Sequence, residues 1–241
     1  MKPSRFASFV LALVACVTVG ATAFTAEASP YATKPAATAR SPKPVATKDK
    51  TLAAIDVQIA AAHVNKKTPG WKTSLPIPKV ATFDPARKYM AHMVTNKGEM
   101  LIEFKPKVAP MHVTNFIYLA RLGFFDGLKF HRVIKGFMAQ GGDPLGNGQG
   151  GPGYQFAGEF DPDTKHDKAG VLSTANAGPN TDGSQFFVMF KAYSSLDMKY
   201  SIFGQVVDGL DVLKKLEDAG NPGDGPPVEP LTITRVTIEA K

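Results

Sequence analysis

The chain has 241 residues, of which 44% are hydrophobic and 10% aromatic, so it can bury one sizeable core. Its net charge of +7 lies in residues 29–80, which hold nine Lys and Arg residues against two acids, whereas residues 81–241 hold 17 against 18. A body that binds nucleic acid would need clustered basic residues of its own, so this charge distribution excludes nucleic acid as its partner.

Residues 1–28 have the pattern of a signal peptide. Lys2 and Arg5 precede an apolar run over residues 6–20, which is too short and wrongly flanked for a membrane span. Two small-residue cleavage patterns, ATA and AEA, follow before residue 29. We therefore expect an exported protein, located in the bacterial periplasm.

A second interpretation of this segment stays open. The letters LVAC, ending at Cys16, resemble a bacterial lipobox, in which the cysteine is lipidated and becomes the first mature residue. The apolar run continues beyond Cys16, which favours soluble secretion. The alternative is a lipoprotein anchored in the envelope, and we expect contact with a membrane only in that case. Because Cys16 is the only cysteine, the chain can form no intrachain disulfide.

Residues 29–80 are predicted to be a basic linker, rich in Pro, Ala and Lys, with one short helix. Residues 29–50 lack any apolar periodicity, as is typical of an extended, solvated segment. Between residues 51 and 64, apolar side chains recur at helical spacing. The next stretch contains three prolines and should be irregular, with Trp71 docking the extension onto the body.

Residues 81–241 are predicted to form one domain of short strands with two helices. A helix over residues 110–122 opens with Pro110, and a second covers residues 210–217. The eight expected strands cover residues 89–95, 99–104, 130–134, 137–140, 171–175, 185–190, 201–207 and 231–239. This pattern predicts a mainly β fold, a closed eight-stranded antiparallel barrel capped by two α-helices.

Three segments carry more polar residues than a barrel core needs. They are FHRVIKGFMAQGGD (residues 130–143), STANAGPNTDGSQFF (173–187) and SLDMKYSIFGQV (195–206). Arg132 and Gln140 lie in a β-rich stretch where each is costly to bury unpaired. In their order and separation these motifs resemble the cyclophilins, the cyclosporin-sensitive peptidyl-prolyl cis–trans isomerases, from about residue 89 to residue 239. The resemblance implies the same barrel with two helical caps.

The resemblance also implies which residues form the site. Arg132 matches the catalytic arginine of the family, and Tyr200 stands where many members have a histidine that walls the pocket. The walls of the proline pocket match Phe137, Met138, Phe187 and Leu196. The groove that holds the substrate backbone matches Gln140, Ala175, Asn176 and Gln185.

The reaction explains this choice of residues. Rotation about an X-Pro bond is opposed by a barrier of roughly 18–20 kcal/mol, because amide resonance makes the C–N bond partly double. No bond breaks, so neither a nucleophile nor a metal is needed, and the enzyme must bind the twisted amide better than either planar isomer. An apolar pocket holds the proline ring, and Arg132 can donate a hydrogen bond to the prolyl nitrogen as it becomes pyramidal. Gln140 could help to orient the guanidinium.

Other candidate sites have plainer interpretations. His131 adjoins Arg132, but the reaction transfers no proton, so we expect a packed, hydrogen-bonded structural histidine. The GNGQGG stretch (residues 146–151) resembles a phosphate cradle, yet Pro152 follows it and no helix does. The histidines and loop aspartates form no ligand pattern, so we predict neither a metal nor any cofactor.

Three residues depart from the family pattern. Ser195 stands where many members have a tryptophan associated with cyclosporin binding, which puts sensitivity to the drug in doubt. Tyr200 replaces the histidine mentioned above, and Met198 replaces a usual glycine. We expect activity to survive with an altered peptide preference.

The sequence thus predicts a monomeric peptidyl-prolyl cis–trans isomerase that acts on proline-containing polypeptides during folding in the cell envelope. The alternative is a proline-peptide-binding chaperone or scaffold module in which isomerase activity is incidental. The residues expected for catalysis are all present, which favours the enzyme. A third hypothesis, that the basic extension anchors the protein to the envelope, rests on the charge of residues 29–80 alone.

Overall fold

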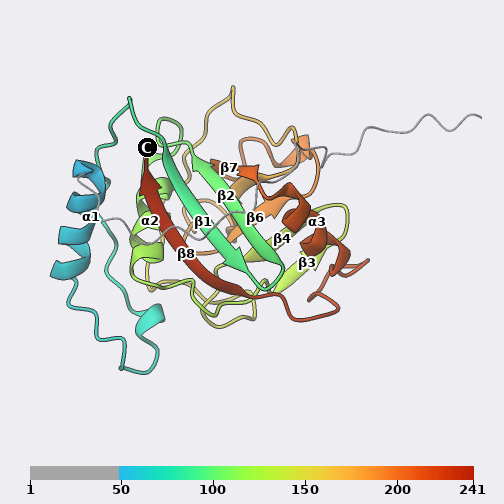
Figure 1. The fold of residues 1–241 in the computed structure, drawn as a ribbon, viewed down its shortest axis with the longest axis horizontal. Helices are drawn as coiled ribbons and strands as arrows, with labels where there is room; N and C mark the ends of the chain where they lie inside the picture. Colours follow the sequence, from blue (N-terminus) through green and yellow to red (C-terminus); the bar gives the residue numbers. More distant parts are fainter. Residues whose placement is uncertain (1–48) are drawn as a thin grey trace, which may run out of the picture.

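The computed structural model describes residues 49–241, so the predicted signal peptide, Cys16 and most of the basic linker lie outside the described residues. Figure 1 shows a curved sheet with α1 and α2 to one side of it in the view and α3 to the other. The helices are α1 (Lys50–Ala61), α2 (Pro110–Arg121) and α3 (Leu210–Asp218), with two 3-10 turns, η1 (Trp71–Thr73) and η2 (Ser194–Leu196). The strands are β1 (Tyr89–Thr95), β2 (Gly98–Phe104), β3 (Arg132–Ile134), β4 (Met138–Gly141), β5 (Val171–Thr174), β6 (Phe186–Met189), β7 (Ile202–Asp208) and β8 (Ile233–Ala240).

The eight strands form one antiparallel sheet in the order β3-β4-β6-β5-β7-β2-β1-β8. The predicted eight antiparallel strands are confirmed, but the prediction of a closed barrel is wrong, because the edge strands β3 and β8 do not pair along their length. The sheet is an open half-barrel.

The gap in the sheet lies between β3 and β8. The predicted strand over residues 130–134 is reduced to the three residues of β3. The gap is spanned by loop contacts instead: Phe130 N–H donates to the Leu231 carbonyl at 3.0 Å, and Gly127 N–H to that of Ile233 at 2.8 Å. These bonds hold the two edges near each other without a continuous ladder.

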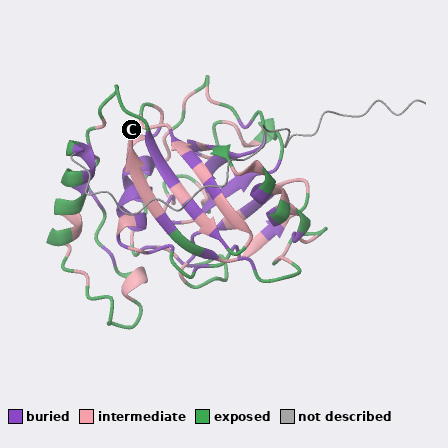
Figure 2. Cartoon of the chain, in the orientation of Figure 1, coloured by how far each residue is buried: buried purple, intermediate pink, exposed green. Residues whose placement is uncertain are grey.

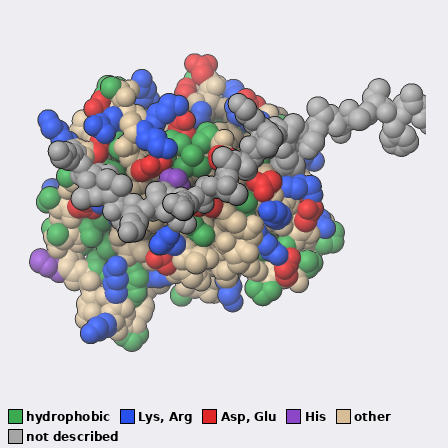
Figure 3. Space-filling view, in the orientation of Figure 1, with side chains coloured by type: hydrophobic (Ala, Val, Ile, Leu, Met, Phe, Trp, Pro, Cys, Tyr) green, Lys and Arg blue, Asp and Glu red, His purple; other side chains and the backbone are tan. Residues whose placement is uncertain are grey.

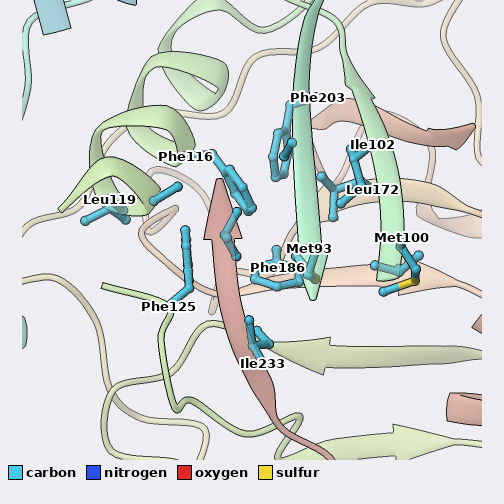
Figure 4. Close-up of a cluster of buried hydrophobic side chains, with 14 of the residues drawn as sticks. Met93, Met100, Ile102, Phe116, Leu119, Phe125, Leu172, Phe186, Phe203 and Ile233 are labelled. Carbon is cyan, nitrogen blue, oxygen red and sulfur yellow. The ribbon is translucent and has the colours of Figure 1, made fainter. Parts of the chain in front are cut away.

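The main core lies between the concave face of the sheet and α2. Helix α2 begins with Pro110 at its first turn and buries nine consecutive residues, His112 to Ala120. Phe116 is at the centre, with its ring stacked on Phe125 at 4.6 Å and in edge contact with Phe186 at 5.6 Å. Figure 4 shows these rings with Met93 of β1, and the buried residues run through the interior in Figure 2. Aromatic pairs of this kind stabilise a core beyond the area that they bury.

The predicted helix in the extension is confirmed as α1, and it lies against α2. Leu52 and Ile55 of α1 are fully buried in the main core. On the outer side of the interface, both nitrogens of an Arg121 fork donate to the Asp56 carboxylate at 2.6 Å. The expected docking of Trp71 is also confirmed, since its ring meets Phe124 edge-on at 6.5 Å. Residues 49–241 therefore hold the three predicted α-helices, one in the extension and two in the body.

The surface of residues 49–241 is of mixed charge. Figure 3 shows Lys and Arg side chains interspersed with Asp and Glu on the visible face. Over the same residues, the structure has no helix with the length and apolar character that a membrane crossing needs.

Candidate functional site

A pocket of about 660 Å³ opens beside strands β3, β4 and β6, and it is where the predicted site residues meet. Nine of the ten line it: Arg132, Phe137, Met138, Gln140, Ala175, Asn176, Phe187, Leu196 and Tyr200. The tenth, Gln185, lines an adjoining cavity of about 820 Å³ that shares Gln140, Ala175 and Asn176 with the first. Residues as far apart in the sequence as Arg132 and Tyr200, 68 positions, thus form one continuous groove.

The apolar side of the pocket rests on a small hydrophobic cluster separate from the main core. Its buried members are Met138, Val171, Phe187, Met189 and Ile202. Four partly buried residues pack against this cluster and line the pocket: Phe137, Ala175, Leu196 and Tyr200. The Phe187 and Tyr200 rings meet edge-on at 5.5 Å, so Tyr200 does wall the pocket. A concave apolar surface of this kind suits a proline ring.

The polar side of the pocket is a chain of hydrogen bonds along the sheet. Arg132 and Gln140 are opposite each other in the β3–β4 ladder, and Arg132 Nη1 donates to Gln140 Oε1 at 3.2 Å. Gln140 Nε2 donates to Gln185 Oε1 at 2.9 Å. Gln185 Nε2 in turn donates to the carbonyls of Gly148 and Gly150, each at 2.9 Å. The orienting role expected of Gln140 therefore has a geometric basis.

A carboxylate that sequence reasoning missed also holds Arg132. Asp224 Oδ1 accepts from Arg132 Nε at 2.5 Å, and Oδ2 accepts from Nη2 at 2.8 Å. The hydrogen bonds to Asp224 raise the pKa of Arg132, and the same contact lowers the pKa of the Asp224 carboxyl. Asp224 lies in NPGDGPPVEP (residues 221–230), a loop whose sequence carries no pattern that would place it at the site.

The glycine-rich loop is organised by Asp143, the last residue of the first motif. Its carboxylate accepts from the backbone N–H groups of Leu145, Asn147 and Gly148 at 2.7, 2.9 and 2.5 Å. Burial acts to raise the pKa of Asp143, but these backbone donors lower it below the usual value. A side chain at Gly150 would begin 1.9 Å from Asp143 Oδ1, so only glycine fits there. The backbone N–H groups of the loop therefore bind the carboxylate of Asp143, an anion within the chain.

His131 lines the pocket, which the sequence did not predict. Both ring nitrogens are buried and neither has a hydrogen-bond partner in the described part of the chain. The expectation of a hydrogen-bonded histidine is therefore wrong, although the residue is packed. Burial lowers the pKa of His131, which favours the neutral ring beside the Arg132 cation.

A Ser-His-Asp arrangement lies behind the pocket wall and was also missed. His166 Nε2 is 2.8 Å from Ser173 Oγ, and its Nδ1 is 2.9 Å from Asp197 Oδ1. The His166 ring stacks on Phe187 at 6.1 Å. Ser173 is fully buried, so its hydroxyl cannot reach a substrate. The arrangement is structural: it connects β5, the Phe187 ring and the turn that carries Leu196.

Met198, which replaces the usual glycine of the family, has a backbone φ of 59°. This is the left-handed region, which glycine enters freely and which costs other residues roughly 1 kcal/mol. The geometry explains the family preference at this position. Its neighbour Ser195 is exposed in η2, outside the residues that line the pocket.

Within residues 49–241, no three His, Cys, Asp or Glu side chains are grouped so that they could hold a metal ion.

Comparison with known proteins agrees with this geometry. The sequence model of the family described as cyclophilin type peptidyl-prolyl cis-trans isomerase/CLD matches residues 90–238. The peptidyl-prolyl cis-trans isomerase A of Mycobacterium tuberculosis is 40% identical over 174 residues, which are 65% of this chain and 96% of that protein. The peptidyl-prolyl cis-trans isomerase-like 2 of Gibberella zeae is 44% identical over 151 residues, but the chain spans only 26% of its length.

A solved structure gives the same result. The crystal structure of a Cryptosporidium parvum cyclophilin type peptidyl-prolyl cis-trans isomerase in the presence of the dipeptide Ala-Pro aligns with a TM-score of 0.60 and 36% identity. The alignment covers 62% of this chain and 98% of that one. The chain belongs to the cyclophilin-type peptidyl-prolyl cis–trans isomerase family. It is an enzyme of the class EC 5.2.1.8.

Proposed function

We propose that this isomerase accelerates rotation of X-Pro bonds in polypeptides that fold in the bacterial cell envelope. The observation that carries the proposal is the position of the Arg132 guanidinium, at the edge of an apolar pocket lined by Phe137, Met138 and Phe187. The crystal structure with Ala-Pro, whose protein is 36% identical to this chain, supports a proline-containing ligand.

The mechanism follows from the two sides of the pocket. The apolar side takes the proline ring, and the amides and backbone groups of Gln140, Ala175, Asn176 and Gln185 hold the flanking peptide. As the amide twists, the prolyl nitrogen becomes pyramidal and gains a lone pair that can accept a hydrogen bond. Arg132 is fixed at this side of the pocket and donates to that lone pair, so it stabilises the twisted state more than either planar isomer.

The envelope location rests on the sequence. The charged N-terminus, the apolar run and the small-residue cleavage patterns of residues 1–28 support export, and the LVAC letters support a bacterial source and the lipidated alternative at Cys16. On this proposal, residues 81–241 are the isomerase domain and act as a monomer. Mass spectrometry of the mature N-terminus separates the two routes: a first residue near 24 or 29 supports soluble secretion, and a lipidated Cys16 supports anchoring.

The catalytic assignment is tested by Arg132→Ala. We expect kcat/KM for a short Ala-Pro peptide to fall by roughly 100-fold, which is the loss found in other enzymes when one hydrogen-bond donor to the transition state is removed. The measurement is two-dimensional NMR exchange spectroscopy. Arg121→Ala is the matched control, because Arg121 is ion-paired with Asp56 of α1 and does not line the pocket. Equal rates for the parent and Arg132→Ala would overturn the role given to Arg132.

The same measurement separates the enzyme from a binding module. A binding module would hold the peptide with unchanged affinity in the parent and in Arg132→Ala, without any exchange catalysed by either. The retention of Arg132, Phe137, Met138, Gln140 and Phe187 in one pocket favours the enzyme.

A further inference from the structure

The loop between α3 and β8 closes one side of the active-site pocket. Gly225 and Pro226 line the pocket, and Asp224 precedes them. Two backbone bonds attach the loop to β3: Asn221 N–H donates to the Val133 carbonyl at 2.8 Å, and Val133 N–H donates to that of Gly225 at 3.1 Å. Asp224 is therefore held between two anchor points next to Arg132.

The contact between Asp224 and Arg132 is geometrically specific. The carboxylate accepts hydrogen bonds from Nε and Nη2 along one edge of the planar guanidinium, at 2.5 and 2.8 Å. The Gln140 side-chain oxygen accepts one from Nη1 at 3.2 Å. A bidentate carboxylate fixes the plane of an arginine fork as well as its position. With partners on both sides, the guanidinium has one orientation, and its remaining N–H bonds are left for a ligand.

The ion pair is too exposed to be explained as a device for stability. The Asp224 side chain is 68% exposed and that of Arg132 is 35% exposed. Pairs with this exposure contribute little to the free energy of unfolding. Orientation of the guanidinium is a better explanation. A small displacement of the donor changes the rate of catalysis but has little effect on the stability of the fold.

We propose that Asp224 is a positioning residue for Arg132: it holds the guanidinium in the orientation that serves the twisted amide and neutralises its charge in the ground state. The proposal rests on the isomerase function proposed above. It goes beyond that function by assigning a role to a loop residue outside the three motifs.

Two consequences follow for the kinetics. Loss of the carboxylate should lower kcat, because the donor is then misplaced in the twisted state, and should leave KM for a neutral peptide nearly unchanged. It should also leave the Arg132 charge uncompensated, so that a peptide with Glu before proline gains affinity over one with Lys. A purely structural role for Asp224 would move neither property.

The test is the parent chain with Asp224→Asn and Asp224→Glu, assayed on Ala-Pro, Glu-Pro and Lys-Pro peptides. We expect Asp224→Asn to lower kcat about tenfold with the melting temperature unchanged, and Asp224→Glu to recover part of the rate because it restores the carboxylate. Asp218→Asn is the matched control, since Asp218 is an exposed carboxylate paired with Lys214 on α3 and does not line the pocket. It should leave kcat unchanged.

A double-mutant cycle shows whether Asp224 acts through Arg132. In the Arg132→Ala background, Asp224→Asn should have no further effect on kcat. An equal loss in both backgrounds, or a kcat for Asp224→Asn equal to or above that of the parent, would overturn the proposal. A parent without isomerase activity would overturn both proposals, whereas an active parent insensitive to Asp224→Asn would overturn this one alone.

Discussion

Two adjacent residues of β6 enter two different hydrophobic clusters. Phe186 points into the main core, where its ring contacts those of Phe116, Phe125 and Phe130. Phe187 points to the opposite face, as successive strand residues do, and joins the small cluster beneath the pocket. The main core is a large cluster of buried residues, while the small cluster is covered by partly buried side chains, most of which line the pocket. The comparison teaches that the pocket is a core left open on one side, where the ring of a substrate proline would complete the packing.

The largest expected effect concerns Phe186 in the main core. Phe186→Ala should lower the free energy of unfolding by about 4 kcal/mol, because it leaves a cavity among rigid rings that cannot collapse to fill it. The measurement is urea denaturation followed by circular dichroism. The activity of the molecules that remain folded should be nearly unchanged, and a loss of stability below 1 kcal/mol would contradict the central place given to Phe186.

In the small cluster beneath the pocket, a substitution should lower activity more than stability. Phe187→Ala removes an apolar wall of the pocket, so we expect kcat/KM for an Ala-Pro peptide to fall about 30-fold, which corresponds to about 2 kcal/mol. Stability should fall by less than it does in Phe186→Ala, because substrate or water can occupy the space. The same denaturation and exchange experiments measure both quantities. A larger loss of stability than of activity would make Phe187 an ordinary core residue.

The smallest expected effect concerns a polar cluster beside the main core. His112 is buried between two carboxylates, with Nδ1 2.6 Å from Glu159 and Nε2 2.8 Å from Asp182. Burial alone would lower the pKa of His112, but the hydrogen bonds and charges of both carboxylates raise it above the usual value. Its contribution to stability is therefore fully present below the unfolded pKa of about 6.5 and is lost as the pH rises through the folded pKa.

This pH dependence must be measured as a difference between two proteins. Burial lowers the pKa of His131 and of His166, and a lowered histidine pKa gives the opposite slope. We therefore compare the unfolding free energy of the parent with that of His112→Gln from pH 5 to pH 9. The difference should decline with pH, by at most about 1.4 kcal/mol per pH unit, the limit for one proton. A difference that is independent of pH would show that His112 stays neutral.

Much of this molecule could be predicted from its sequence, because its motifs are local. Short apolar runs between turn residues placed the eight strands, and helical spacing placed α2, α3 and α1. The family motifs placed nine site residues around one pocket. Residue type and spacing along a single segment decide these features.

The features that sequence reasoning missed depend on contacts between distant segments. Asp224 reaches Arg132 across 92 positions of the chain, and nothing in its own loop indicates that contact. The open edge depends on how β3 and β8 meet, and there residues 127–130 and 231–233 make loop contacts in place of a ladder. Leu52 and Ile55 were expected in a helix, but their full burial depends on the partner surface of α2.

The Asp143 carboxylate has a consequence for the thermodynamics of binding. Because an internal anion already occupies the backbone donors of the glycine-rich loop, the loop has its shape before any peptide arrives. The Gly148 and Gly150 carbonyls then hold Gln185, and through it Gln140 and Arg132. Association with a peptide therefore requires little loss of conformational entropy on the protein side, and the free energy of contact remains available for twisting the amide.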